Sequence, residues 1–153
     1  MQRIILDSTY LLPLIGIDVG IPDEELRTLF LSKNKLFANE ISIFEVLGKG
    51  LREIIKKKLP SNRFQIGLSS LRDDDSIHLI TLRESLEYSS LIAQIYLSGL
   101  TDIPDCIILG TAIKFDILLT ESQDIPQIAT SFKEFHNLKI LNWVNFKKKI
   151  LKI

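Results

Sequence analysis

The chain has 153 residues, of which 46% are hydrophobic, and its 19 basic and 19 acidic side chains give a net charge of zero. This size and apolar content predict one folded domain over residues 1–153 and exclude a disordered chain. The zero net charge argues against a protein that coats nucleic acid by bulk electrostatics, although it leaves room for an enzyme that contacts a short stretch of backbone. No apolar run approaches the roughly 18 residues of a membrane span. The single cysteine fits a reducing compartment, so we expect a cytoplasmic protein that does not engage a membrane.

Short apolar runs alternate with helical patterns along the whole chain. The expected strands cover residues 3–7, 36–38, 77–80, 117–120 and 139–141. The expected helices cover residues 8–17, 41–58, 62–72, 84–97 and 105–115, a further helix opens at Pro22, and residues 142–153 are expected to form a basic tail. Strands that alternate with helices are typical of βα units. The sequence therefore predicts a three-layer α/β/α sandwich with a short central, mainly parallel sheet, whose strands end at one edge.

The first expected strand is followed by an acid. Ile4, Ile5 and Leu6 form an unbroken apolar run, which is the pattern of a strand buried on both faces, and Asp7 comes directly after it. Open α/β sheets place their functional sites at the carboxyl ends of the strands. A carboxylate is costly to bury there unless a metal ion, another cation or several hydrogen bonds compensate its charge. The acidic turn at residues 120–124 follows another strand and falls on the same edge.

Glu45 is a second candidate acid. It lies beside the apolar stripe of the helix expected at residues 41–58, and an acid against an apolar face needs a partner. That partner is either a functional site or Lys49, which lies one turn later along the same helix. Glu40 competes with Glu45, but it precedes the helix, where an acid is typical of a helix cap.

Asp105 is a third candidate. It follows Pro104 and opens a stretch of almost wholly apolar and small residues, as in a helix that packs against a sheet. An aspartate at the start of a helix is most often a cap, so both interpretations stay open. Asp102 is a neighbouring alternative.

Two other patterns allow two interpretations each. The lysine triplets at residues 56–58 and 147–149 are either solvated helix ends, favoured by the helix dipole, or contacts to a phosphate backbone. A set of apolar residues in the expected helices either packs in the core or contacts a second protein. These residues are Leu11, Leu12, Leu26, Leu29 and Phe30.

Four segments in this order resemble the PIN-domain family of metal-dependent ribonucleases, most closely the VapC-like toxins of prokaryotic toxin–antitoxin pairs. They are Ile5-Leu6-Asp7-Ser8-Thr9, Ile41-Ser42-Ile43-Phe44-Glu45-Val46-Leu47, Pro104-Asp105-Cys106-Ile107-Ile108-Leu109-Gly110-Thr111-Ala112 and Leu118-Leu119-Thr120-Glu121-Ser122-Gln123-Asp124. No single segment is specific, but the ordered set spans about residues 4–125. The resemblance implies that Asp7, Glu45 and Asp105 are the core acids of a metal site, with the hydroxyl of Ser8 or Thr9 beside them.

The last motif departs from the family pattern. The family commonly has an aspartate two residues after Thr120, where this chain has Ser122. The fourth carboxylate is then Asp124, which we prefer, or Glu121, or it is absent. Thr120 and Ser122, like Ser8, are expected to hold waters or a phosphate beside the ligands.

Oxygen ligands of this kind suit Mg²⁺ or Mn²⁺, and no soft-ligand set competes with them. The expected activity is metal-dependent cleavage of RNA phosphodiesters, with a small antitoxin and a second copy of the chain as the partners that the resemblance implies. A PIN-like module that binds RNA or protein without turnover is the alternative that Ser122 supports. A metal-dependent phosphatase is a further alternative, but the haloacid-dehalogenase-like pattern needs an acid where this chain has Thr9.

Overall fold

A five-stranded sheet forms the centre of the computed structural model, which describes residues 1–153. The strands lie in the order β3-β2-β1-β4-β5, and every neighbouring pair is parallel. Each expected strand is present within about two residues of its expected ends. The bounds are Arg3–Leu6 for β1, Lys35–Asn39 for β2, Ile77–Ile80 for β3, Ile117–Leu119 for β4 and Lys139–Leu141 for β5.

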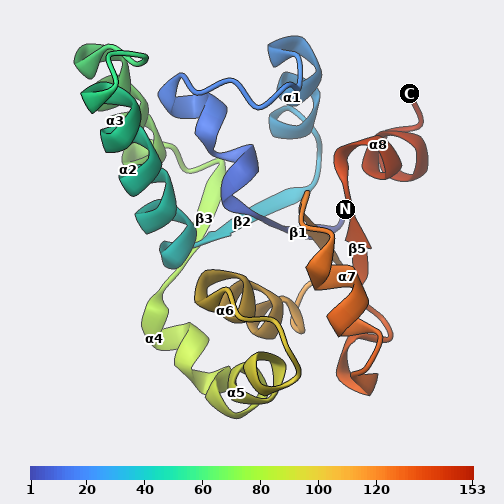
Figure 1. Ribbon diagram of the computed structural model, residues 1–153. Helices are drawn as coiled ribbons and strands as arrows, with labels where there is room; N and C mark the ends of the chain where they lie inside the picture. The colour runs from blue at the N-terminus through green and yellow to red at the C-terminus, as the bar shows by residue number, and fades with distance from the viewer.

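Helices cover both faces of this sheet and complete three layers (Figure 1). One face packs against α1 (Asp23–Phe30), α2 (Glu40–Ile55), α3 (Ser61–Asp73) and α8 (Trp143–Phe146). The other face packs against α5 (Ser89–Leu97), α6 (Ile103–Ala112) and α7 (Asp124–Ala129). The short helix α4 (Leu82–Ser85) leads from β3 towards α5. The expected α/β/α sandwich is therefore confirmed.

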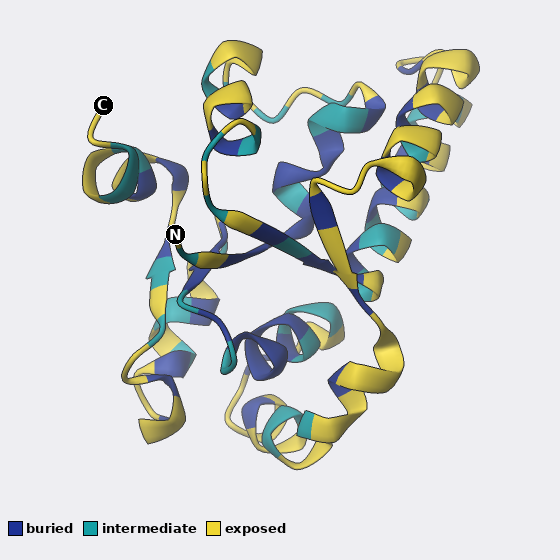
Figure 2. Cartoon of the chain, turned by 180° about the vertical axis from the view of Figure 1, so that it is seen from behind, coloured by how far each residue is buried: buried dark blue, intermediate teal, exposed yellow.

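The first strand contributes to both hydrophobic cores. Ile4 and Leu6 belong to the core under α1, α2 and α3, whereas Ile5 belongs to the core under α5 and α6. All three side chains are fully buried. Side chains alternate between the faces of a strand, so a continuous apolar run is what a strand covered on both sides requires. Figure 2 shows this burial at the centre of the sheet and exposure on the outward sides of the helices.

The helix expected at residues 8–17 is absent. Two short 3₁₀ turns, Ser8–Tyr10 and Leu12–Ile15, take its place. Pro13 lacks the N–H that a regular helix needs, and Gly16 ends the second turn with a φ of 95°, in the left-handed region. This segment packs tightly on α3, where a Cβ at Gly67 would lie 2.4 Å from the carbonyl oxygen of Leu14.

The helix expected at residues 84–97 is divided into α4, a 3₁₀ turn at Leu86–Tyr88 and α5. It also begins earlier, because Thr81 forms a capping box with Glu84. The helix expected at 105–115 likewise begins two residues early, at Ile103. Asp102 caps it by accepting a hydrogen bond from the backbone N–H of Asp105 at 3.0 Å.

The C-terminal segment is not a tail. Residues 143–146 form α8, and a π-helical turn follows at Lys147–Leu151. Trp143 and Phe146 are 5% and 0% exposed, and their rings stack with centroids 5.8 Å apart. The burial of these two rings in the core therefore stabilises the segment more than the solvation of the lysines that follow them in the sequence opposes it.

The apolar residues that were candidates for a contact with a second protein are core residues. Four of them are at most 6% exposed, and the fifth is half-buried against the same core. The contact interpretation is therefore wrong for these positions, which are Leu11, Leu12, Leu26, Leu29 and Phe30. None of the helices is both long enough and apolar enough to cross a bilayer.

Candidate functional site

Asp7 lies at the carboxyl edge of the sheet, between the ends of β2 and β4. Its backbone N–H donates to the carbonyl of Leu119 at 3.0 Å, which continues the pairing of β1 with β4. Its side chain is 7% exposed and accepts three hydrogen bonds. The donors are the backbone N–H and the hydroxyl of Ser8, at 2.5 and 3.3 Å, and the hydroxyl of Thr120, at 2.8 Å. The carboxylate is thus held in one orientation.

Thr120 also organises the turn that follows β4. Its backbone N–H donates to the carbonyl of Leu141 in β5, at 3.0 Å, and its hydroxyl accepts from the backbone N–H of Ser122, at 3.1 Å. The hydroxyl of Ser122 accepts from Ile125 N–H at 3.4 Å, so Ser122 supports the start of α7. Thr120 and Ser122 therefore hold the turn and the carboxylate of Asp7. Thr9, the other expected hydroxyl, is half-buried beside Ser8 in the sequence.

Glu45 reaches the same region from α2. It is half-buried, and its Oε1 atom is buried with no hydrogen-bond partner. Burial, and then the negative charge of Asp7, raise the pKa of Glu45, while Lys49 and the hydroxyl of Ser8 partly oppose this rise. The charge of Lys49, the expected neighbour, therefore lowers the pKa of Glu45, but the two side chains form no ion pair within 4.0 Å. An unpaired carboxylate oxygen out of water is costly and indicates a missing partner.

Asp105 lies at the start of α6 and is half-buried. Burial first, and then the charges of Asp7, Asp102, Glu45 and Asp124, raise its pKa from 3.8 to about 7. The five acids are therefore close enough for their charges to act on one another. Asp105 is also the backbone donor to Asp102, so the capping role belongs to Asp102 and leaves the carboxylate of Asp105 free.

Asp124 is exposed at the first turn of α7, on the rim of this cluster. Its charge is the smallest of those that raise the pKa of Asp105. The structure thus brings acids from β1, α2, α6 and α7 to one edge of the sheet.

The two alternative acids are engaged elsewhere. Glu121 accepts hydrogen bonds from the hydroxyl of Tyr10 and from the backbone N–H of Trp143, the latter at 2.7 Å. Glu40 accepts from the backbone N–H of Leu82 at 2.7 Å and so caps α4. Both side chains have structural partners, and neither contributes to the raised pKa of Glu45 or Asp105.

The donor set and the unpaired oxygen fit a hard divalent cation, because both consist of carboxylate oxygen. In their present positions, however, no three side chains of His, Cys, Asp or Glu form a group that could hold a metal ion. Convergence of the acids around an ion therefore stays a prediction.

A buried polar cluster at the end of β2, formed by Asn39, Ser85 and Thr111, was not expected from the sequence. Asn39, at the end of β2, is fully buried and donates to the hydroxyls of Ser85 at 2.7 Å and Thr111 at 3.4 Å. Its side-chain oxygen accepts from Ile41 N–H at 3.0 Å, which caps α2. The sequence signal was available, since an asparagine directly before a helix is a typical cap.

Cys106, next to Asp105, is buried and donates to the carbonyl of Leu100 at 2.9 Å. Burial, followed by the charges of Asp105 and Asp102, raises the pKa of its thiol to about 11. A thiol with this pKa is not a nucleophile at neutral pH.

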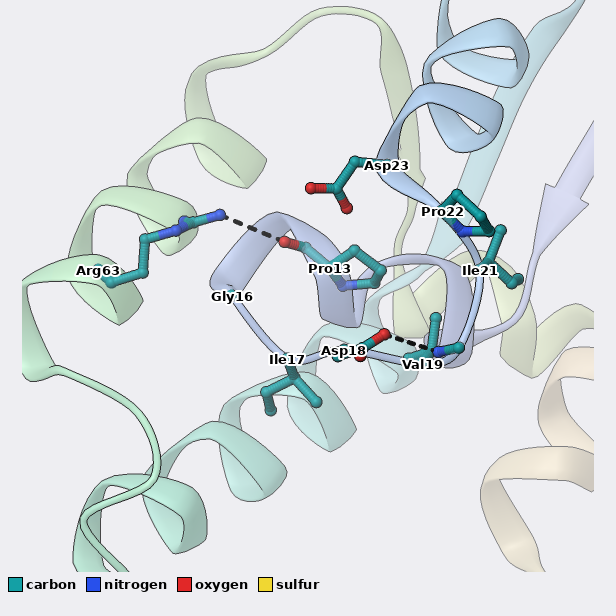
Figure 3. A pocket seen from close by; sticks show the side chains of 10 residues that line it. Pro13, Gly16, Ile17, Asp18, Val19, Ile21, Pro22, Asp23 and Arg63 are labelled. Carbon is teal, nitrogen blue, oxygen red and sulfur yellow. Dashed lines mark hydrogen bonds between the residues drawn. The ribbon is translucent and has the colours of Figure 1, made fainter.

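A cavity of about 640 Å³ lies apart from the acids (Figure 3). It is formed by the loop from Pro13 to Asp23 and by Arg63 of α3, which donates to the carbonyls of Leu14 and Pro13 at 2.8 and 3.3 Å. None of the candidate acids lines it. The cavity is therefore separate from the candidate site.

No protein-family model matches the sequence, and no curated protein matches it. Among solved structures, the fold is similar to that of a chain in the crystal structure of VapBC2 from Rickettsia felis bound to a DNA fragment from their promoter. The two chains are 20% identical, and the match covers 92% of this chain and 98% of that chain with a TM-score of 0.55. At this level of identity the similarity concerns the fold, which is PIN-like.

Proposed function

We propose that this protein is a divalent-metal-dependent endoribonuclease, with Asp7, Glu45, Asp105 and Asp124 as ligands of Mg²⁺ or Mn²⁺. The observation that carries the proposal is the buried, unpartnered Oε1 atom of Glu45, within reach of the charge of Asp7. Glu25, Glu40 and Glu121 have hydrogen-bond donors, whereas this buried oxygen has none. A bound cation would supply the partner and offset the repulsion that raises the pKa of Asp105.

Each residue has a distinct task in this proposal. Ser8 and Thr120 donate hydrogen bonds to the carboxylate of Asp7 and hold it in one orientation at the edge of the sheet. Glu45 and Asp105 approach from two different helices and complete the ligand set, and Asp124 closes it from α7. When bound, a divalent ion supplies an activated water and neutralises charge on the phosphodiester.

The likeness in fold to a VapBC2 chain, together with the motifs at the four acids, also supports a place in a toxin–antitoxin pair. In this proposal the partner is a small antitoxin protein that covers the site, and the protein forms a homodimer. Size-exclusion chromatography with light scattering tests the dimer: a mass near 35 kDa, twice the 17.5 kDa of the chain, is expected, and a mass near 17.5 kDa contradicts it.

The substitution Asp7→Asn tests the activity. It keeps the size of the side chain, whose remaining oxygen can still accept from Ser8 while its NH2 group can donate to the hydroxyl of Thr120, but it removes the charge that a cation requires. We expect loss of Mn²⁺-dependent RNA cleavage with an unchanged circular dichroism spectrum and unchanged RNA affinity. Glu121→Gln is the matched control, because it removes the carboxylate that follows Thr120 and accepts from Tyr10 and Trp143 instead.

Mn²⁺ binding, measured by calorimetry beside cleavage, separates the alternatives. Unchanged cleavage by Asp7→Asn would rule out the ligand assignment. RNA affinity without turnover in the wild-type protein, at saturating Mn²⁺, would instead identify a non-catalytic binding module, as the serine at position 122 suggests.

A further inference from the structure

A row of basic side chains leads away from Glu45 along α2. Lys49, Arg52 and Lys56 follow it at intervals of four, three and four residues. At 3.6 residues per turn, these four positions fall within about 60° of one another around the helix axis, and each step rises by about 4.5–6 Å. The row therefore begins at the candidate site and runs towards the end of α2, beside α3 (Figure 1).

The first two cations of the row are free to bind an anion. Lys49 is half-buried and Arg52 is exposed, and neither takes part in an ion pair. A Cβ at Gly48 would lie 3.7 Å from Nη1 of Arg52, so the guanidinium lies back along the helix, in the direction of Glu45. Lys56 lies 3.5 Å from Glu53 in an exposed pair, which is too weak to compete with a phosphate.

The charges beside the row explain why these cations are needed. The site concentrates acids from four elements, and this field repels any phosphodiester that approaches it. Among the groups that shift the pKa of Glu45, Lys49 is the one basic residue. The groups that shift the pKa of Asp105 include no basic residue. Beyond the charge that a bound divalent ion would offset, cations at the border of the acids would therefore help to hold a polyanion beside them.

An exposed aromatic ring lies at the same end of the row. Phe44 directly precedes Glu45 and is 70% exposed, which is unusual for a phenylalanine. Its position is about 100° around the helix from Glu45, on the other side of Arg52. A row of cations that tracks one backbone, with a ring on which a base can stack, is the arrangement of surfaces that bind single strands.

We propose that α2 carries the substrate: a single strand of RNA lies along the helix with its phosphates on Lys49, Arg52 and Lys56 and one base stacked on Phe44. This inference rests on the proposed ribonuclease function and adds the class and the path of the substrate. A duplex does not fit it, because the bases of a duplex are already stacked and cannot reach the ring of Phe44.

The test uses the full chain with Asp7→Asn, which prevents cleavage, and a fluorescent single-stranded RNA of twelve nucleotides. We expect Lys49→Gln combined with Arg52→Gln to weaken binding about tenfold at low salt and to reduce the slope of log K against log salt by roughly 1.4, or 0.7 for each lost contact. Phe44→Ala should weaken binding about tenfold with an unchanged slope, because stacking releases no counterions. The matched control is Lys133→Gln with Arg27→Gln, one exposed lysine and one exposed arginine outside the row, for which we expect less than a twofold change.

Two results would overturn the inference: equal affinities and slopes for the row variant and the control, or binding of a twelve-base-pair duplex as tight as that of the single strand. The first result, with Phe44→Ala also silent, would leave α2 as a surface for a protein partner. Cleavage by the protein with Asp7 intact is measured separately. Absence of cleavage contradicts the proposed function, while the affinities and slopes still decide the path of the strand.

Discussion

Two groups of acids in the molecule have opposite surroundings. Glu121 and Glu25, on the flank next to α8, have several donors each: Glu121 accepts from Tyr10 and Trp143, and Glu25 accepts from the indole of Trp143 at 2.8 Å and from a lysine at 2.7 Å. At the sheet edge, Glu45 has a buried oxygen without a donor, and burial and like charges raise the pKa of Glu45 and Asp105.

The difference distinguishes a structural role from a functional one. On the flank, the protein supplies every donor, and the pKa of Glu25 is lowered by its hydrogen bonds to Lys147 and Trp143. At the edge, Glu45 keeps a buried oxygen without a donor, which costs stability and is retained only where a ligand repays it. The following experiments ask whether the two groups respond as differently as this contrast requires.

The largest effect is expected from the flank. Trp143→Ala removes a ring that is 5% exposed, packs on Phe146 and Tyr10, and donates to Glu25. The free energy of unfolding should fall by about 3–5 kcal/mol, as measured by urea denaturation. Trp143→Phe keeps most of the packing and should cost clearly less. Equal losses for the two variants would show that the indole hydrogen bond, and not the ring packing, holds α8.

Tyr10→Phe isolates one bond of the flank. The hydroxyl of Tyr10 donates to Glu121, and burial together with this bond raises the pKa of Tyr10. Since the acceptor is charged, removal of the hydroxyl should lower the free energy of unfolding by about 1.5–3 kcal/mol, again by urea denaturation. A change below about 0.5 kcal/mol would mean that Trp143 alone satisfies Glu121.

At the sheet edge, the expected change in the free energy of unfolding has the opposite sign. Without metal at pH 8, Asp105→Asn removes a charge that its neighbours repel, so the variant should be more stable than the wild type, by up to about 1 kcal/mol after solvent screening. Thermal unfolding in a chelator measures this gain. Adding Mn²⁺ should raise the melting temperature of the wild type and much less that of the variant. A less stable variant would place Asp105 among the structural acids.

The pH dependence of the metal-free wild type follows from the same residue. Its carboxyl binds the proton more tightly in the folded chain, with a pKa of about 7, than in the unfolded chain, where 3.8 is ordinary. The contribution of Asp105 to stability should therefore fall as pH rises from about 4 to about 7 and stay low above that. Measuring the free energy of unfolding of the wild type and of Asp105→Asn over this pH range isolates the contribution of Asp105. A difference between the two proteins that does not change with pH would contradict it.

Glu25→Gln should have the smallest effect, with the opposite pH dependence. The pKa of Glu25 is lowered in the folded protein, so its contribution is present above about pH 4.5 and is lost as the pH falls below that value. Melting temperatures of wild type and variant should differ at pH 7 and converge near pH 3. A difference that persists at pH 3 would mean that the substitution disturbs the packing of Trp143.

Local patterns predicted the sheet well, whereas the roles of the acids stay a prediction. The runs around Ile4 and Leu118 are buried on both faces, so their composition alone indicates strands in a parallel sheet. Asp7 and Asp105 are candidates because their positions, after a strand and at the start of a helix, are visible in the sequence. The convergence of their charges with that of Glu45 follows from topology, since all three elements begin or end at one edge.

Features that depend on distant contacts were missed. The segment at residues 142–153 is rich in lysine, and only the packing of Trp143 and Phe146 on the core makes it helical. The helix at 84–97 has helical composition throughout, yet it is interrupted at Leu86–Tyr88. The role of Glu121 depends on Tyr10, which is 111 residues away in the sequence. No pattern within a short window carries such information.

The bonds of Thr120 and Glu121 set an order for the assembly of the edge during synthesis. Thr120, which holds Asp7, donates to Leu141 in β5, and Glu121 accepts from Trp143. All four candidate acids are translated before either partner emerges. In the proposed ribonuclease, the edge would therefore be complete only after β5 and α8 have been synthesised and have packed against it.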